Sequence, residues 1–109
     1  MEATIRADRN VTTLVNIFTV EPENQEKLAA ALNEGTETFF GKMPGFISSS
    51  VLTGKNGRQV INYSQWRSAG DIEAFRQNPN FRPYIECIAA LSKGEAIVCD
   101  VAFVHAASS

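Results

Sequence analysis

A short Asn-Gly turn between two strand-like runs constrains the fold of this chain more than any other feature. The runs at 46–54 and 58–66 combine apolar and β-branched residues, and Asn56 and Gly57 lie between them. An Asn-Gly pair in that setting is the strongest short signal of a β-hairpin. The chain is therefore expected to hold an antiparallel strand pair, around which its other elements are arranged.

Further strands and helices flank this hairpin. Residues 11–20 and 95–105 are β-branched and aromatic, which predicts a first and a last strand. From Pro22 to Gly41, apolar residues recur at helical spacing, with proline where a helix begins. These patterns predict a helix between the first strand and the hairpin.

The helical region after the hairpin is predicted to be broken into two pieces. Ser68 and Asp71 resemble a capping box at the start of a short helix, and Pro79 interrupts that helix. A second piece runs from about 81 to 92, and Gly94 is expected to end it. The order of elements predicts an α+β fold, a ferredoxin-like βαββαβ domain with a broken second helix and an antiparallel sheet.

Length and composition limit the organisation and the partners. With 109 residues, the chain is expected to form one domain at 11–105, preceded by a flexible N-terminal arm at 1–10. A net charge of −2 argues against nucleic acid, and no apolar run is long enough for a membrane helix. Cys87 and Cys99 are interpreted as buried free thiols of a cytoplasmic protein, and a lone His105 predicts no metal site.

The pattern makes both faces of the first and the last predicted strand apolar. In the first strand, Leu14 and Phe18 alternate with Val15 and Ile17, and the last strand behaves in the same way. Two helices can cover only one face of a four-stranded sheet, and an uncovered apolar face usually marks an interface. The sequence therefore predicts a homodimer in which two sheets pack face to face.

A polar row lies in a strand that should be buried. Asn62, Ser64 and Trp66 alternate onto one face, while Tyr63 faces the other way, and Asn16 lies within the first strand. A buried amide is costly unless it is hydrogen-bonded, so these groups predict a small-molecule pocket with directed donors. Its expected aromatic walls are Phe39, Phe40, Phe75, Phe81 and Tyr84.

A purely structural interpretation of this row stays open. Asn16 could bond to the backbone at a β-bulge, and Trp66 could be a core anchor whose N–H reaches a carbonyl. In that case, the domain would be a structural module without a ligand.

Several segments resemble the antibiotic biosynthesis monooxygenase (ABM) domain family. They are MPGF at 43–46, the Asn-Gly hairpin, INYSQW at 61–66 and NPNFRPYI at 78–85. The resemblance spans about 11–104 and implies a dimeric α+β barrel. It also implies a monooxygenase that needs no cofactor. Such an enzyme would oxidise an aromatic polyketide-type phenol or anthrone to a quinone with O2.

The resemblance assigns roles to particular residues. Asn16, Asn62 and Trp66 match the family's catalytic positions, and Arg82 loosely matches an arginine on the last helix. The residues expected to bind the substrate are Arg82 and three aromatic residues, Phe39, Phe75 and Tyr84.

Two alternatives within the family remain. The heme-degrading branch needs a histidine about ten residues after the tryptophan, where this chain has Arg76. The other alternative is a small-metabolite-binding protein with the ABM fold but without this chemistry.

Overall fold

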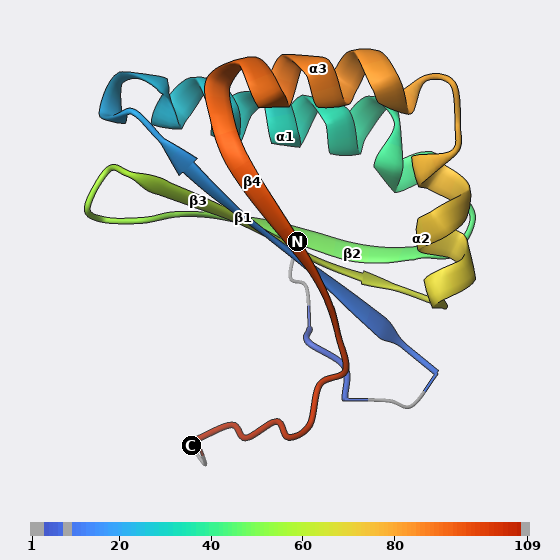
Figure 1. Ribbon diagram of the computed structural model, residues 1–109. Helices are drawn as coiled ribbons and strands as arrows, with labels where there is room; N and C mark the ends of the chain where they lie inside the picture. The colour runs from blue at the N-terminus through green and yellow to red at the C-terminus, as the bar shows by residue number, and fades with distance from the viewer. Residues whose placement is uncertain (1–3, 8–9, 108–109) are drawn as a thin grey trace.

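The computed structural model describes residues 4–7 and 10–107, and it shows one antiparallel sheet with helices on one face (Figure 1). The strand order is β2-β3-β1-β4. The strands are β1 (Thr12–Val20), β2 (Phe46–Thr53), β3 (Gln59–Trp66) and β4 (Ser92–Cys99). The helices are α1 (Gln25–Thr38), α2 (Ala69–Arg76) and α3 (Phe81–Leu91), with short 3-10 turns η1 (Pro22–Asn24) and η2 (Phe40–Lys42). The predicted α+β, ferredoxin-like βαββαβ order with a broken second helix is confirmed.

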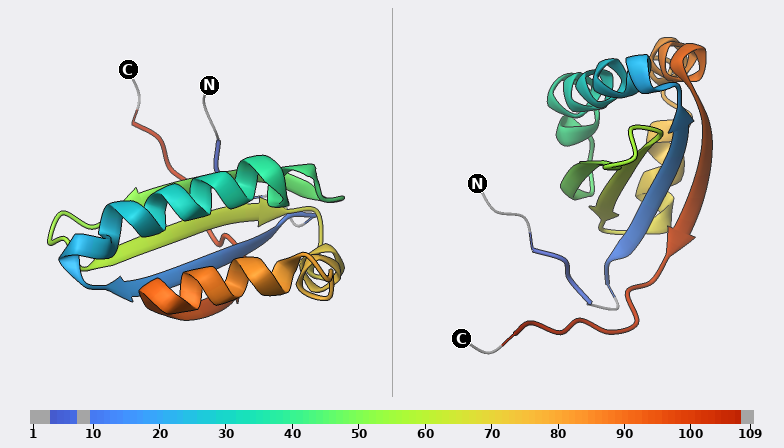
Figure 2. Two further views of the ribbon diagram at one scale, coloured as in Figure 1. Left: turned by 90° about the horizontal axis from the view of Figure 1, so that it is seen from above. Right: turned by 90° about the vertical axis from the view of Figure 1, so that its left-hand side faces the viewer.

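The three helices do not cover the sheet equally. Helices α1 and α3 lie side by side across one face, whereas α2 stands at the end of the sheet where β3 ends (Figures 1 and 2). Only Arg67 and Ser68 separate Trp66 from the start of α2, so α2 closes this end of the space beneath α1 and α3.

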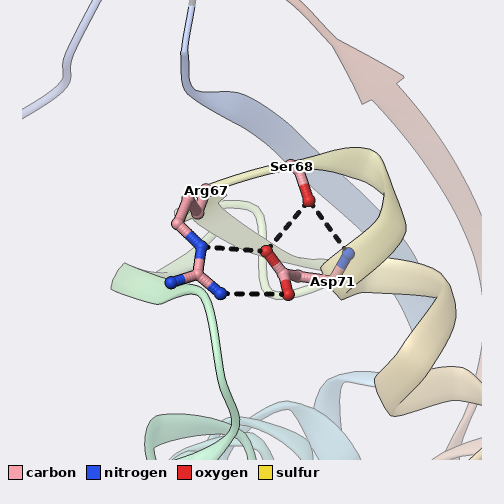
Figure 3. A network of polar contacts seen from close by, with 3 residues as sticks. All are labelled: Arg67, Ser68 and Asp71. Atoms are coloured by element: carbon pink, nitrogen blue, oxygen red, sulfur yellow. Dashed lines mark hydrogen bonds and ion pairs between the residues drawn. The ribbon is translucent and has the colours of Figure 1, made fainter.

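A compact polar network begins α2 (Figure 3). The Ser68 hydroxyl accepts a hydrogen bond from the Asp71 backbone N–H at 3.2 Å and donates to Asp71 Oδ2 at 2.9 Å. Arg67 Nε lies 3.3 Å from the same carboxylate oxygen. Hydrogen bonds from Arg67 and Ser68 lower the pKa of Asp71. The predicted helix start is confirmed, since an N-cap hydroxyl satisfies a backbone donor that the helix leaves unpaired.

The last strand begins earlier than the pattern predicts. Strand β4 starts at Ser92, whose extended φ of −157° ends α3, and residues 100–107 continue without regular structure. Gly94 lies inside β4, opposite Phe18 in the register, so the prediction that it ends the helix is wrong. A Cβ on Gly94 would lie 2.8 Å from carbons of the Phe18 ring. Its lack of a side chain therefore makes room for that ring.

The cysteine interpretation is wrong about burial. Cys87 is exposed on α3 and Cys99 is half-buried, and both are free thiols. Helix α3 has only one covered stripe, in which Tyr84 and Ile88 face the sheet side, and Ile85 at its margin is 39% exposed. Apolar composition around a cysteine therefore did not determine its burial.

Two hydrophobic clusters lie between the sheet and the helices. We call them the aliphatic cluster, made of Phe18, Val20, Leu28, Leu32, Val60 and Ile88, and the aromatic cluster, made of Leu14, Phe40, Trp66, Ile72 and Phe75. Tyr84 packs against both clusters. Along β1, Asn16 lies between Leu14 and Phe18, so the polar row falls where the two clusters meet.

The other face of the sheet contacts the chain's N-terminal segment. Gln65 is fully buried there: its Nε2 donates to the Arg6 carbonyl at 2.9 Å and to Thr13 Oγ at 3.1 Å. The Arg6 N–H donates to Gln65 Oε1 at 2.9 Å. Residues 1–3 and 8–9 of the predicted flexible arm lie outside the described residues, so its flexibility stays a prediction.

The helices are too short or too polar for a lipid bilayer. Over residues 4–7 and 10–107, none has the length and apolar character to cross a membrane. The cytoplasmic location stays a prediction from the sequence.

Candidate active site

A cavity of about 320 Å³ lies between the helix-covered face of the sheet and the helices above it. All four strands and all three α-helices contribute to its lining. Its volume falls at the lower end of the range typical of small-molecule sites, about 300–1,000 Å³. The polar groups in its wall therefore decide which ligands it can orient.

The three residues predicted to be catalytic share this cavity. Asn16 on β1 and Asn62 on β3 are directly opposite in the antiparallel register, and Trp66 follows on the same face of β3. The shared face follows from the period of two along a strand. The predicted convergence of Asn16, Asn62 and Trp66 around one cavity is thus seen in the structure, while their roles in a reaction stay predictions.

Asn62 is oriented by a neighbouring strand. Ser49 Oγ on β2 donates to Asn62 Oδ1 at 3.1 Å, and the Asn62 side chain is buried. Because an amide has two donor hydrogens on nitrogen, holding the oxygen leaves Nδ2 as the available donor. Within the described part of the chain, no acceptor for that Nδ2 is found, so it can serve a ligand in the cavity.

Asn16 has no hydrogen bond from its side chain to any described residue. The register around it is regular, and the shift that marks a bulge lies in β2, between Phe46 and Ser48. The expected alternative, an Asn16 amide bonded to the backbone at a bulge, is therefore not seen. Its amide lines the cavity opposite Asn62, with the small Ala96 on its other side in β4.

Trp66 combines an anchoring role with a place in the cavity wall. Its ring stacks on Phe75 at 4.8 Å between centroids and meets the edge of Phe46 at 5.3 Å. Its Nε1–H donates to Ser64 Oγ at 3.0 Å, and the residue is 1% exposed. The indole donor is thus held by Ser64, whose hydroxyl also lines the cavity.

Most of the expected aromatic wall is present. The cavity is lined by Phe40, Phe75, Phe81 and Tyr84, whereas Phe39 is not part of the lining. Helix α1 ends at Thr38, and Phe39 turns the chain with φ −132° and ψ −71° into the 3-10 turn that begins at Phe40. This turn brings Phe40 rather than Phe39 to the cavity, although Phe39 still packs against the aromatic cluster.

Tyr84 is expected to stay neutral. Burial, with a smaller contribution from nearby Cys87, raises the pKa of its phenol well above its ordinary value of 10.0. A phenol with a raised pKa keeps its proton at neutral pH. Tyr84 can therefore donate a hydrogen bond to a ligand but cannot act as a general base.

The structure distinguishes two arginines. Arg82, which the sequence pointed to, is exposed on α3 and is not part of the cavity lining, whereas Arg76 at the end of α2 lines the cavity. The helical period gives only a partial signal for Arg76, because it depends on which face of α2 packs inward. Arg76 follows buried Ile72 by four residues and Phe75 by one, which places it beside the inner face of α2.

Among the described residues, Glu95 is the one carboxylate in the cavity lining, which holds no histidine. His105 and Tyr63 line a separate hollow on the opposite face of the sheet. Glu95 contributes to the cavity lining, but its partner in the register is Ile17, on the strand face turned away from Asn16. Residues 4–7 and 10–107 also hold no cluster of potential metal ligands, and the single histidine lies away from the heme ligand's position at Arg76.

Comparison with known proteins agrees with this geometry. A family model described as antibiotic biosynthesis monooxygenase matches residues 12–86. Tetracenomycin-F1 monooxygenase from Streptomyces glaucescens is 37% identical over 107 residues, which cover 98% of this chain and 96% of that protein.

Solved structures show the same fold. SnoaB, a cofactor-independent oxygenase from Streptomyces nogalater, is 26% identical with a TM-score of 0.74, covering 87% of this chain and 96% of the other. A monooxygenase from the gene ActVA-Orf6 of Streptomyces coelicolor, in complex with the ligand nanaomycin D, has a TM-score of 0.82 at 24% identity, covering 93% and 96%. At that identity, the second likeness concerns the fold alone.

Proposed function

We propose that this chain, which belongs to the antibiotic biosynthesis monooxygenase family, oxidises an aromatic polyketide-type phenol or anthrone to a quinone with O2. As a monooxygenase of this family, it needs only a site that orients the substrate and stabilises the charge that develops on it. The observation that supports the substrate class is the pairing of Asn16 with Asn62 above a wall of aromatic rings. Flat rings fit such a wall, and amides suit a carbonyl or an enolate oxygen.

The reaction is balanced without a flavin or a metal. An anthrone loses a proton from its CH2 carbon and becomes a delocalised, electron-rich carbanion. The carbanion passes one electron to O2, and the carbon radical and superoxide combine into a peroxide, which gains a proton. Loss of the second C–H proton with cleavage of the O–O bond leaves the quinone carbonyl and one water.

The amides stabilise the negative charge in this sequence. Asn62 Nδ2 donates to the enolate oxygen, since Ser49 holds the amide oxygen away from it. One such donor in a water-poor site typically lowers the barrier by about 3 kcal/mol. Asn16, directly opposite, positions the substrate or the peroxide.

Trp66 provides the wall against which the substrate rings lie. Its indole is held in place by Ser64, because Nε1–H donates to Ser64 Oγ and the Ser64 hydroxyl donates in turn to the Leu14 carbonyl at 3.4 Å. Orientation of this kind brings the reacting carbon and O2 together, and exclusion of water protects the carbanion.

An oxygen-uptake assay tests this function. Purified protein in chelator-treated buffer receives dithranol, an anthrone, and dissolved oxygen is followed against a protein-free background. We expect Asn62→Ala and Trp66→Phe each to slow quinone formation by about tenfold or more, with the circular dichroism spectrum retained. Asn33→Ala, on the exposed side of α1, is the matched control and should leave the rate unchanged.

Two outcomes would count against these assignments. Oxygen uptake by the unmodified protein no faster than background would contradict the proposed function. Unchanged rates in both variants would remove Asn62 and Trp66 from the site.

We also propose a homodimer formed through the face of the sheet opposite the helices. On that face Val15 and Ile17 are only half-buried, Ile97 is 43% exposed, and Phe103 in the C-terminal segment is 83% exposed. An apolar surface of this kind favours a partner. Light scattering at micromolar concentration should give the mass of two chains, and the mass of one chain would contradict the proposal.

A further inference from the structure

We propose that Arg76 binds the ionised oxygen of the substrate, so that the cavity selects the phenolate or enolate form and lowers the pKa of the bound substrate. This rests on the proposed function and deepens it, because it names the form of the substrate that the site takes. It also assigns the charge-binding role to Arg76 on α2, whereas the resemblance to the family favours Arg82 on α3.

The guanidinium group of Arg76, a residue of the cavity lining, retains free donors. Its Nη1 lies 3.3 Å from Glu73 Oε1, one turn earlier on α2, and its side chain is 33% exposed. A guanidinium has five N–H donors in a planar fork. Because no other described residue accepts from it, most of these donors remain for an anionic ligand. In the described part of the chain, Arg76 is the one cationic side chain that lines the cavity.

The surroundings of Arg76 strengthen its effect on a ligand. Next to it, Phe75 stacks on Trp66, so the adjoining wall is aromatic and apolar. A charge acts more strongly in such surroundings than in water. An aromatic ligand lying along Phe75 would have an edge near the end of α2, where the positive charge is located.

The other ionisable groups around the cavity do not cancel this charge. Glu73, its ion-pair partner on α2, is 62% exposed and screened by water. On α3, Tyr84 stays neutral because burial raises its pKa. On β4, Glu95 contributes to the cavity lining, but it lies opposite Ile17, five positions along β1 from the residue that faces Trp66 at the α2 end. At the α2 end, Arg76 is therefore the charged side chain that the cavity lining presents to a ligand.

This charge would make it easier for the bound substrate to lose its proton, even without a strongly basic side chain beside it. Neither His105 nor Tyr63 reaches the cavity, since both line the opposite face of the sheet. An opposite charge within a few ångströms lowers the pKa of an acid by about 1–3 pH units. A substrate acidified in this way can lose its proton to water, so the site does not require a basic side chain.

A structural role for Arg76 alone makes different predictions. Its place in the last turn of α2 complements the helix dipole, and the pair with Glu73 is of the kind found on exposed helices. Both effects stabilise the helix, but neither changes the ionisation of a ligand. The test therefore measures ligand ionisation directly.

The probe is alizarin, a dihydroxyanthraquinone whose absorption spectrum changes when a phenolic proton is lost. Its apparent pKa is measured by spectrophotometric titration, free and bound to the protein. We expect the unmodified protein to lower the pKa of bound alizarin by about 1–3 pH units and Arg76→Gln to reverse most of that change. Arg82→Gln is the matched change at an exposed position of α3, and it should leave the pKa of bound alizarin as it is in the unmodified protein.

Arg76→Lys keeps the positive charge, so it separates the effect of lost charge in Arg76→Gln from an effect of disturbed folding. It should retain most of the lowered pKa, with melting temperatures measured for all variants. The proposal is overturned if alizarin does not bind, if Arg76→Gln leaves the bound pKa unchanged, or if Arg82→Gln has the same effect as Arg76→Gln. Because alizarin is already a quinone, this result stands apart from the oxygen-uptake assay, and either proposal can fail alone.

Discussion

The aliphatic and aromatic clusters lie under the same helices but differ in what they enclose. The aliphatic cluster includes Leu28 and Val60, both fully buried, and most of its members are simple hydrocarbon side chains. The aromatic cluster contains Trp66 and Phe75, and its packing stops at the polar row, where the cavity opens. Phe18, Leu32 and Ile88 of the aliphatic cluster also line the cavity, so both clusters border it, but the aromatic cluster provides most of its flat ring surfaces.

The geometry of rings explains why the aromatic end can remain partly open. Rings pack edge to face, as between Phe40 and Phe75 at 5.0 Å, or stack, as between Trp66 and Phe75. Each arrangement leaves flat surfaces that a planar ligand can extend. Branched aliphatic side chains interdigitate and leave no such surface. Tyr84, which contacts both clusters, joins the two ends.

The strongest test of this comparison shortens one leucine in each cluster. Leu28→Ala and Leu14→Ala remove the same atoms from buried positions, so each should lower the free energy of unfolding by about 2–5 kcal/mol. Only Leu14 lines the cavity, so only Leu14→Ala should also weaken alizarin binding. Urea unfolding and absorbance titration measure the two effects. Equal loss of affinity in both variants would mean that the clusters are not separate in function.

A second test disturbs Tyr84, the residue that contacts both clusters, by changing the glycine that packs against its ring. Gly35 on α1 is buried against the Tyr84 ring, and a Cβ there would collide with the ring carbons. We expect Gly35→Ala to lower the free energy of unfolding by about 1–3 kcal/mol through overpacking and to weaken alizarin binding.

The matched control for this change is Gly70→Ala on α2, where a Cβ has ordinary space, 3.6 Å from Ser68 Oγ. It should stabilise the protein by about 0.5–1 kcal/mol, since alanine favours the helix. If Gly35→Ala retains full stability and affinity, Tyr84 does not couple the two clusters.

The smallest expected effect concerns the start of α2 at the aromatic end. Because the folded protein lowers the pKa of Asp71 below its ordinary value of 3.8, its ionised form stabilises the fold above that value. This contribution is lost as the pH falls through the lowered pKa. Asp71→Asn should remove it, so unfolding free energies of the two proteins should converge in strong acid. A gap that stays constant between neutral and strongly acidic pH would contradict this role.

Much of the candidate site could be predicted because strand periodicity is a local property. Asn62, Ser64 and Trp66 had to share a face once residues 59–66 formed a strand, and Asn16 joined them once the sheet placed β1 beside β3. The aromatic walls followed less directly. Phe39 and Phe40 were both expected in the wall, but only Phe40 lines the cavity, because a single turn after α1 decides which ring faces inward.

The arginine that lines the cavity could not be chosen from the sequence alone. Both Arg76 and Arg82 follow an apolar residue in a short helix, and the resemblance to the family favoured Arg82. The position of α2 at the end of the sheet decided between them (Figure 1). The same is true of the start of β4, where contact with Phe18 gave Gly94 a place in the strand.

The sequence by itself determined the order of elements, the face that each strand residue occupies and the family to which the chain belongs. These depend on neighbours a few positions away, through backbone periodicity and turn chemistry. Only the tertiary structure decided that an open volume remains between the two clusters, that Ser49 and Ser64 hold the amide and the indole, and that Arg76 borders the cavity. Each of these depends on how side chains from distant segments fill a shared space, which no local pattern records.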